Sequence, residues 1–426
     1  MRWALGLVPV VAGGGWATFQ WLESRDAADK RIRAARSTQE AAWLCFARHP
    51  DTRRILSAAL EAGRFYAPAW LVNACWYLEQ GEWNLTRAIL SHPRLRDTPE
   101  ARLLLELAER RPRSSDWRHA FFEAWKSLGR PDFSKSPLLP EPLEVFHVLA
   151  HVRGAWEAAD PNQRLMLVAL EVTLAEASHP GVLEQVRATS SVPLLLALRE
   201  QLLLIETRVP SRQLLLPAVD ERLGQLAGPS PRTLQLALFS FLAGSVPSAL
   251  LERGDLEVLE KLVVLSEWKQ PSSERFFLET RERFEGLLPA PGHHAWLLAS
   301  SAQGGSLGME LLRRAQASKA HLSEDEQRWM GRLLWEVGAR LREQRSRLEL
   351  EMGLRLQLFG SELTGHSDTR MDSITLWVEL GQWEESVKRS AYNRWPLASL
   401  QEESCELRAR DEHAWLRAFA GKGELP

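Results

Sequence analysis

The stretch that decides the fold runs from Ser323 to Phe359 and reads SEDEQRWMGRLLWEVGARLREQRSRLELEMGLRLQLF. Ser323 and Glu326 form a capping box at its start. In such a box the hydroxyl and the carboxylate each accept a backbone N–H that the first helical turn leaves without a partner. The spacing therefore predicts that a helix begins at residue 324.

Apolar residues then recur at helical spacing, and the charged residues lie largely off their stripe. The stripe comprises Leu334, Val337, Leu341, Leu348 and Met352. The pattern predicts one helix from about residue 324 to residue 359, on the order of 50 Å long, which Gly338 and Gly353 could interrupt. The charged residues between 340 and 349 read as a solvated face, with a partner-binding basic stripe as the alternative.

Similar signals for helices and for their first residues recur along the chain of 426 residues. Its abundant Leu, Ala, Arg, Glu and Gln are good helix formers, and no convincing period-2 alternation indicates strands. A capping side chain followed by Pro at the first helical position predicts further helix starts. These starts are Thr98-Pro99, Asp160-Pro161 and Ser230-Pro231, and Asp255 is expected to cap a helix that begins at Leu256.

Proline-rich breaks divide the chain, because Pro cannot continue a helix interior. They lie near residues 130–142 and 289–293, with a shorter one at 227–231. We therefore expect the following parts: a hydrophobic N-terminal segment (1–22), helical repeat blocks (23–130 and 143–288), a third block with the one long helix (292–421) and a flexible tail (422–426). One continuous helical solenoid that passes through both of the longer proline-rich breaks remains an alternative.

A short pattern returns along the chain: an apolar residue, two spacers, Gly, one spacer and a large apolar residue. Its best instance contains Gly81 and Trp83, followed by Ala88, and the second contains Gly381 and Trp383, followed by Val387. Here the chain resembles tetratricopeptide-like helical repeats, which place Gly and then an aromatic early in each unit. The matching glycines are not spaced by multiples of 34 residues. The resemblance, which covers about a quarter of the chain, implies an all-α fold, an irregular α-solenoid of stacked antiparallel helix pairs.

The first segment carries no charge from Trp3 to Leu22. It fits a membrane anchor of about 20 residues, a cleaved export signal or a packed helix. Pro9 and the three glycines 13–15 weaken the anchor reading. The basic residues 25–36 that follow favour a cytoplasmic body on a membrane, and an exported or periplasmic protein is the alternative.

Composition excludes some classes. The formal net charge of −2 gives no global basic field, so no nucleic-acid partner is expected. Three widely spaced cysteines, Cys45, Cys75 and Cys405, argue against a disulfide framework or a zinc site, so we expect core residues. Most of the 18 tryptophans should wedge between helices. The helical examples are Trp76, Trp83, Trp125, Trp156, Trp335 and Trp377.

Two motifs deserve a chemical test. Gly304 to Gly308 matches G-x-S-x-G, which in α/β-hydrolases holds a nucleophilic Ser between a strand and a helix. No parallel-sheet pattern surrounds Ser306, so we expect a helix–helix turn. His147 and His151 share a helix face, but no third zinc ligand accompanies them. His293-His294 is expected in a turn.

No catalytic, metal-binding or cofactor-binding residue is therefore assigned, and no cofactor is expected. The sequence favours a non-enzymatic helical-repeat scaffold or adaptor that binds another protein, with a membrane contact through residues 3–22 in one reading. An enzyme or effector with an unrecognised active site, or a nucleic-acid-binding α-solenoid, are the alternatives.

Overall fold

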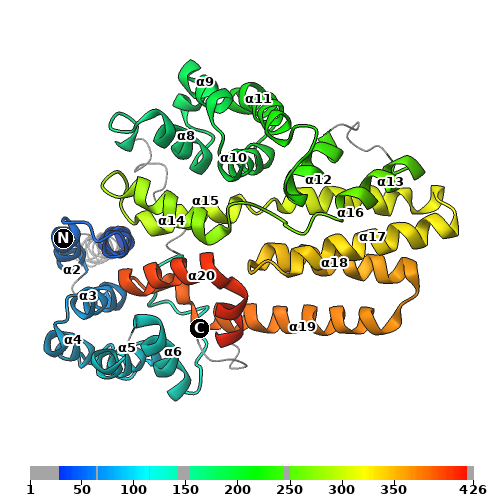
Figure 1. The fold of residues 1–426 in the computed structure, drawn as a ribbon. Coiled ribbons are helices and arrows are strands. Elements are labelled where there is room, and N and C mark those ends of the chain that lie inside the picture. The colour runs from blue at the N-terminus through cyan, green and yellow to red at the C-terminus, as the bar shows by residue number, and fades with distance from the viewer. Residues whose placement is uncertain (1–27, 64–65, 115, 143–153, 244–249, 420–426) are drawn as a thin grey trace, which may run out of the picture. The chain divides into compact units, whose positions relative to one another are not determined.

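The computed structural model describes residues 28–63, 66–114, 116–142, 154–243 and 250–419 (Figure 1). Every regular element within these ranges is an α-helix or a 3₁₀-helix, which confirms the all-α class. The apolar segment 3–22, the tail 422–426, and His147 with His151 lie outside the described residues. Among the helices that are described, none combines the length and the apolar character needed to span a bilayer.

The chain divides into two compact units. The first unit comprises residues 1–146 and 388–401, and the second comprises residues 147–387 and 402–426. The chain therefore passes from one unit to the other three times. The proline-rich stretch 130–142 precedes the first passage, whereas residues 289–293 lie inside the second unit.

The first unit is a set of short helices around buried aromatic side chains. Gly81, with φ of +75°, lies just after the end of one helix and turns the chain into the next. The helices are residues 28–46, α2 (Thr52–Ala62), α3 (Ala67–Glu79), α4 (Trp83–Leu90), α5 (Pro99–Arg110), η1 (Arg111–Arg113), α6 (Trp117–Ser127) and η5 (Tyr392–Arg394).

Residues 388–401 belong to this unit because two side chains fix them there. Trp395 is fully buried, and its ring meets those of Phe121 and Phe133 edge-on, with centroids 6.0 and 5.4 Å apart. The guanidinium of Arg394 donates to five backbone carbonyls of the proline-rich stretch. These are the oxygens of Phe133 (3.4 Å), Ser134 (2.9 Å), Ser136 (2.9 Å), Leu139 (2.8 Å) and Pro140 (2.7 Å).

The second unit holds the longer helices around one apolar core. Its helices are α8 (Pro161–Leu170), η3 (Ala175–Ser178), α9 (Pro180–Ala188), α10 (Val192–Leu204), α11 (Pro210–Ala227), α12 (Leu234–Ala243), α13 (Arg253–Leu262), α14 (Ser273–Phe284), α15 (Pro291–Ser301), α16 (Gly305–Ser318), η4 (Lys319–His321), α17 (Glu324–Arg342), α18 (Arg347–Thr364), α19 (Ser367–Ser390) and most of α20 (Ala398–Phe419).

Most of the predicted caps are confirmed. The side chains of Thr98, Asp160 and Ser323 accept backbone N–H groups at the starts of α5, α8 and α17. The helix start predicted at Ser230-Pro231 is wrong, because α12 begins only at Leu234. Its first N–H groups instead bond to the carbonyls of residues 267 and 268.

Asp255 does cap a helix, although the start of that helix was placed too late. The helix α13 begins at Arg253, and Asp255 closes a capping box by accepting the backbone N–H of Glu252 at 2.8 Å. The cap therefore acts from inside the first turn.

The single long helix expected over 324–359 was also wrong. The chain forms a hairpin of α17 and α18, and Ser346 caps the second helix by accepting the N–H of Glu349. Neither Gly338 nor Gly353 interrupts its helix. Both lie on the faces where the two helices meet.

The two best repeat matches occupy different settings. Gly81 lies in the turn between α3 and α4, whereas Gly381 lies in the interior of α19. The local pattern therefore does not mark one structural position along the chain.

Candidate interaction surface

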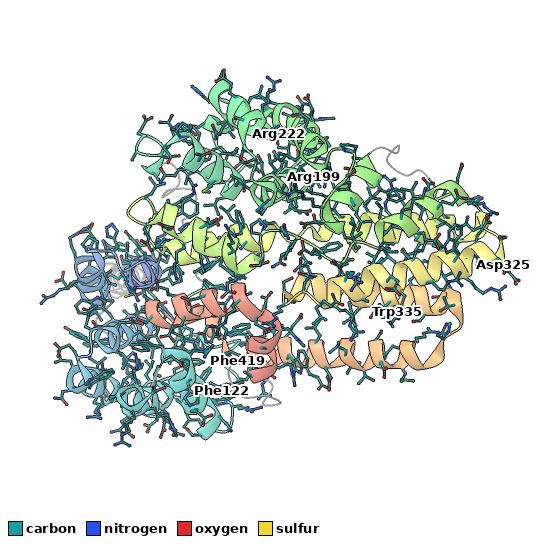
Figure 2. The ribbon with its side chains drawn as sticks, in the orientation of Figure 1. Phe122, Arg199, Arg222, Asp325, Trp335 and Phe419 are labelled. Atoms are coloured by element: carbon teal, nitrogen blue, oxygen red, sulfur yellow. The ribbon has the colours of Figure 1, made fainter. Side chains whose placement is uncertain are left out.

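Ser306, the candidate nucleophile, lies in the first turn of α16. Gly304 precedes the helix with φ of +68°, and α15 precedes that turn, so the motif links two helices as expected. The Ser306 hydroxyl donates to the carboxylate of Glu200 on α10. The neighbouring Arg199 (Figure 2) donates to Ser306 Oγ at 3.3 Å and to Asp220 Oδ1 at 2.8 Å.

This cluster ties α10, α11 and α16 together. Burial raises the pKa of Glu200, and the bonds from Ser306 and the charge of Arg199 partly oppose that rise. A nucleophilic serine needs a base and, beyond it, donors aimed at a developing oxyanion in an open site. Here both the proton and the oxygen of Ser306 are engaged in interhelical bonds, so we assign the cluster a structural role.

A second polar cluster surrounds Glu349, which is buried in the first turn of α18. Its carboxylate accepts from Trp268 Nε1 at 3.0 Å, from Lys269 Nζ at 2.5 Å and from Ser346 Oγ at 2.6 Å. A cavity of about 10 Å³ beside Lys269 and Ser273 has room for one water molecule. The hydrogen bonds to Glu349 satisfy its buried ion pair with Lys269. The cavity beside them is too small for a substrate.

His293 and His294 were expected in a turn, which was wrong. Both lie buried in the first turn of α15, where Pro291 starts the helix. Burial, helped by His294 and Arg408, lowers the pKa of His293 to about 3. The ring is therefore neutral near pH 7 and packs as a core residue.

The cysteines are confirmed as core residues. Cys45, Cys75 and Cys405 are free and buried, and burial raises the pKa of the Cys45 and Cys75 thiols. These two side chains are therefore protonated thiols and not reactive thiolates. Within the described part of the chain, no group of three or more His, Cys, Asp or Glu residues could hold a metal ion.

Five of the six tryptophans singled out in the sequence lie in helices, and Trp156 instead lies in a turn before α8. Trp125 is buried, and the others are half-buried. Arg164 lies over Trp156 and Arg355 over Trp377, with the guanidinium carbon 5.6 and 5.2 Å from the ring centroid. These tryptophans pack mainly within the protein.

The described surface carries its clearest apolar face on α19. Met371, Ile374 and Val378 are 62%, 38% and 52% exposed. Their spacing of three and then four residues places them on one side of the helix over two turns. A single exposed apolar residue is ordinary, whereas three adjacent ones on one helix face form an apolar patch.

The opposite side of α19 is already packed. Leu380 and Trp383 are buried, Arg355 of α18 lies over Trp377, and Arg347 of α18 pairs with Glu384. Within this unit α17, α18 and α19 lie side by side, with α18 in the middle (Figure 1). The exposed apolar face therefore does not contribute to the contact with α18.

Space and charge around this face also suit a partner. A Cβ added at Gly381, about one turn beyond Val378, would meet no atom within 4 Å. Arg370 and Asp372 are exposed beside Met371. The spacing of these residues is visible in the sequence, since α19 carries apolar residues on both faces.

Comparison with known proteins gives no match to any family model, to any curated protein or to any solved structure.

Proposed function

We propose that the protein is a non-enzymatic scaffold that binds another protein through the exposed apolar face of α19. The observation that carries this proposal is the row formed by Met371, Ile374 and Val378, which is exposed on a helix whose other side packs within the unit. Burying such side chains contributes about 25 cal/mol for each Å² removed from water.

The chemistry of the face fits an amphipathic helix of the partner. Apolar residues at i, i+3 and i+7 cover about 10 Å of helix and present a ridge of side chains that can pack into a groove of another helix. The open space at Gly381 lets the partner backbone approach closely, because no side chain stands there. Exposed Arg370 and Asp372 supply charges of both signs at the rim, where charges fix orientation more than affinity.

The architecture proposed with it is an irregular α-solenoid of stacked antiparallel helix pairs. Short connections between α3 and α4, between α14 and α15, and between α17 and α18 support this arrangement. Helix pairs of this kind build extended surfaces for protein recognition.

An enzyme is less well supported. Ser306 of α16 is bonded to Glu200 of α10, Glu349 of α18 is bonded to Lys269, and the cavity beside Lys269 holds about one water molecule. These groups explain cohesion within the second unit without a substrate.

The test is capture of partners by the purified, tagged full-length chain. We expect M371S/I374S/V378S to lose at least one partner that the wild type captures reproducibly. The matched control L204S/V264S/L278S replaces three exposed apolar residues elsewhere in the same unit. It should capture the same proteins as the wild type. Equal capture by both variants would contradict the assignment to α19.

A further inference from the structure

The exposed side of α19 continues beyond its three apolar side chains. At about 100° of rotation per residue, the exposed positions from 371 to 385 that share this side fall within an arc of about 120° and span about 21 Å. We call them the α19 seam. It comprises Met371, Ile374, Thr375, Val378, Gly381, Gln382 and Glu385, all of which are exposed. On the other side of the helix Ser373, Leu380 and Trp383 are buried.

The seam has the spacing that a second helix needs for coiled-coil packing. In a coiled coil, a side chain of one helix inserts into a hole between four residues of the facing helix, at positions i, i+3, i+4 and i+7. The first such hole is formed by Met371, Ile374, Thr375 and Val378, and the second by Val378, Gly381, Gln382 and Glu385. The two holes are seven residues apart, so one helix can fill both in successive heptads.

The second hole is open down to the backbone at Gly381. A Cβ at this residue would meet no atom within 4 Å, so no described side chain covers the α19 backbone there. Gly338 in α17 differs, because a Cβ at that residue would collide with α18. A side chain of a second helix can therefore reach the backbone of α19 at residue 381.

The chemistry of the two holes differs. The first hole is largely apolar, and the hydroxyl of Thr375 already donates to the carbonyl oxygen of Met371 at 3.0 Å. An apolar side chain can enter it without leaving that donor unpaired. Glu385 adds a carboxylate at the far end of the second hole. A carboxylate that is removed from water needs a cationic partner.

We infer that α19 forms a two-stranded coiled coil with one helix of the partner, which inserts one apolar side chain into each hole. This inference rests on the proposed function of α19. The partner helix carries these two side chains about seven residues apart. It also carries a Lys or Arg where it passes Glu385, since charge complementarity fixes register and orientation. The partner is therefore a protein that exposes an amphipathic helix with a heptad pattern.

The experiment places a photoreactive amino acid at Thr375 or at Gln382 of the full-length chain, one beside each hole. The chain is irradiated in an extract of the cells that produce it, and the crosslinked residues are mapped by mass spectrometry. We expect both adducts to form with the same protein, on residues about seven apart in its sequence. Gly381→Leu should lower the Gln382 adduct by roughly tenfold, because the new side chain overpacks the second hole.

Gly254→Leu is the matched control. Gly254 is exposed in α13, a Cβ there would also meet no atom within 4 Å, and the exposed Val258 follows four residues later. This variant should leave the Gln382 adduct unchanged. Neither variant should unfold at a lower urea concentration than the wild type, because Leu is a better helix former than Gly.

The outcomes separate this inference from the assignment of the α19 face. A Gln382 adduct that survives Gly381→Leu, while M371S/I374S/V378S still loses the captured protein, would overturn the coiled coil and leave the assignment intact. Adducts that map to separate segments of the partner would do the same. A crosslinked dimer of the chain itself, or no adduct at either position, would overturn both.

Discussion

The backbones of Gly338 in α17 and Gly353 in α18 meet directly. A Cβ built on either residue would lie 2.6 Å from the carbonyl oxygen of the other. Gly331 and Gly360 repeat this relationship seven residues away, with distances of 2.8 and 2.5 Å. The hairpin of α17 and α18 is therefore packed at backbone contact over two turns, which only glycine allows at these four positions.

Gly338→Ala should destabilise the protein. The new Cβ meets backbone atoms of α18 that cannot rotate away, and such overpacking costs about 1–3 kcal/mol. The gain of up to about 1 kcal/mol in helix propensity does not offset a forced separation of the helices. We expect a net loss of about 1 kcal/mol in the free energy of unfolding, measured by urea denaturation.

Gly381→Ala is the matched control in α19. Its Cβ would meet nothing within 4 Å, so only the propensity gain remains. A stabilisation of about 0.5–1 kcal/mol is expected. Equal effects of the two substitutions would show that the close approach of α17 and α18 does not constrain residue 338.

Arg394→Lys should loosen the first unit. A lysine ammonium has three donors and cannot span five carbonyl oxygens, whereas the planar guanidinium reaches all of them. Buried acceptors that lose a charged donor cost about 1–3 kcal/mol. Faster hydrogen exchange over residues 133–140 is the expected readout.

The control for this prediction is Arg96→Lys. Arg96 is exposed and pairs with Asp97, and such surface pairs contribute about 0–1 kcal/mol. Exchange over residues 133–140 that stayed slow in Arg394→Lys would contradict the role given to the Arg394 guanidinium.

His293 should make stability depend on pH. Its folded pKa of about 3 lies below the ordinary value of 6.5, so the unfolded chain takes up the proton first as pH falls. This contribution to stability is present above pH 6.5 and is lost as the pH falls from 6.5 toward 3. Burial of His413 acts in the same direction, while the raised pKa of Glu200 acts in the opposite one.

The measurement compares His293→Gln with the wild type at pH 6.5 and pH 5.0. The wild type should lose about 1.5 kcal/mol more than the variant over this interval, because only the wild type carries the buried ring. Identical losses in both proteins would mean that His293 is protonated or solvated in the folded state.

Local chemistry could be predicted from the sequence, and long-range pairing could not. The caps at Thr98, Asp160 and Ser323 are set by residues within one turn of each other, so the pattern located them correctly. The break at residues 343–346 contains no Gly or Pro, and the apolar stripe continues across it, so the hairpin was read as one helix.

The attachment of residues 388–401 to the first unit left no local signal either. Arg394 bonds to carbonyls more than 250 residues earlier in the chain. Every residue has a backbone carbonyl, so the sequence does not show which of them accepts these hydrogen bonds. By contrast, the exposed face of α19 could have been found, because Met371, Ile374 and Val378 follow helical spacing opposite Leu380 and Trp383.

The α19 face is tested most directly by site-specific photo-crosslinking. A photoreactive amino acid placed at Val378 should form one defined adduct with another protein, since this side chain is 52% exposed within the proposed contact. The same group at Leu204, which is 79% exposed at the end of α10, should not form that adduct. The same adduct at both positions, no adduct at Val378, or a crosslinked dimer of the chain itself would contradict binding of a partner protein by α19.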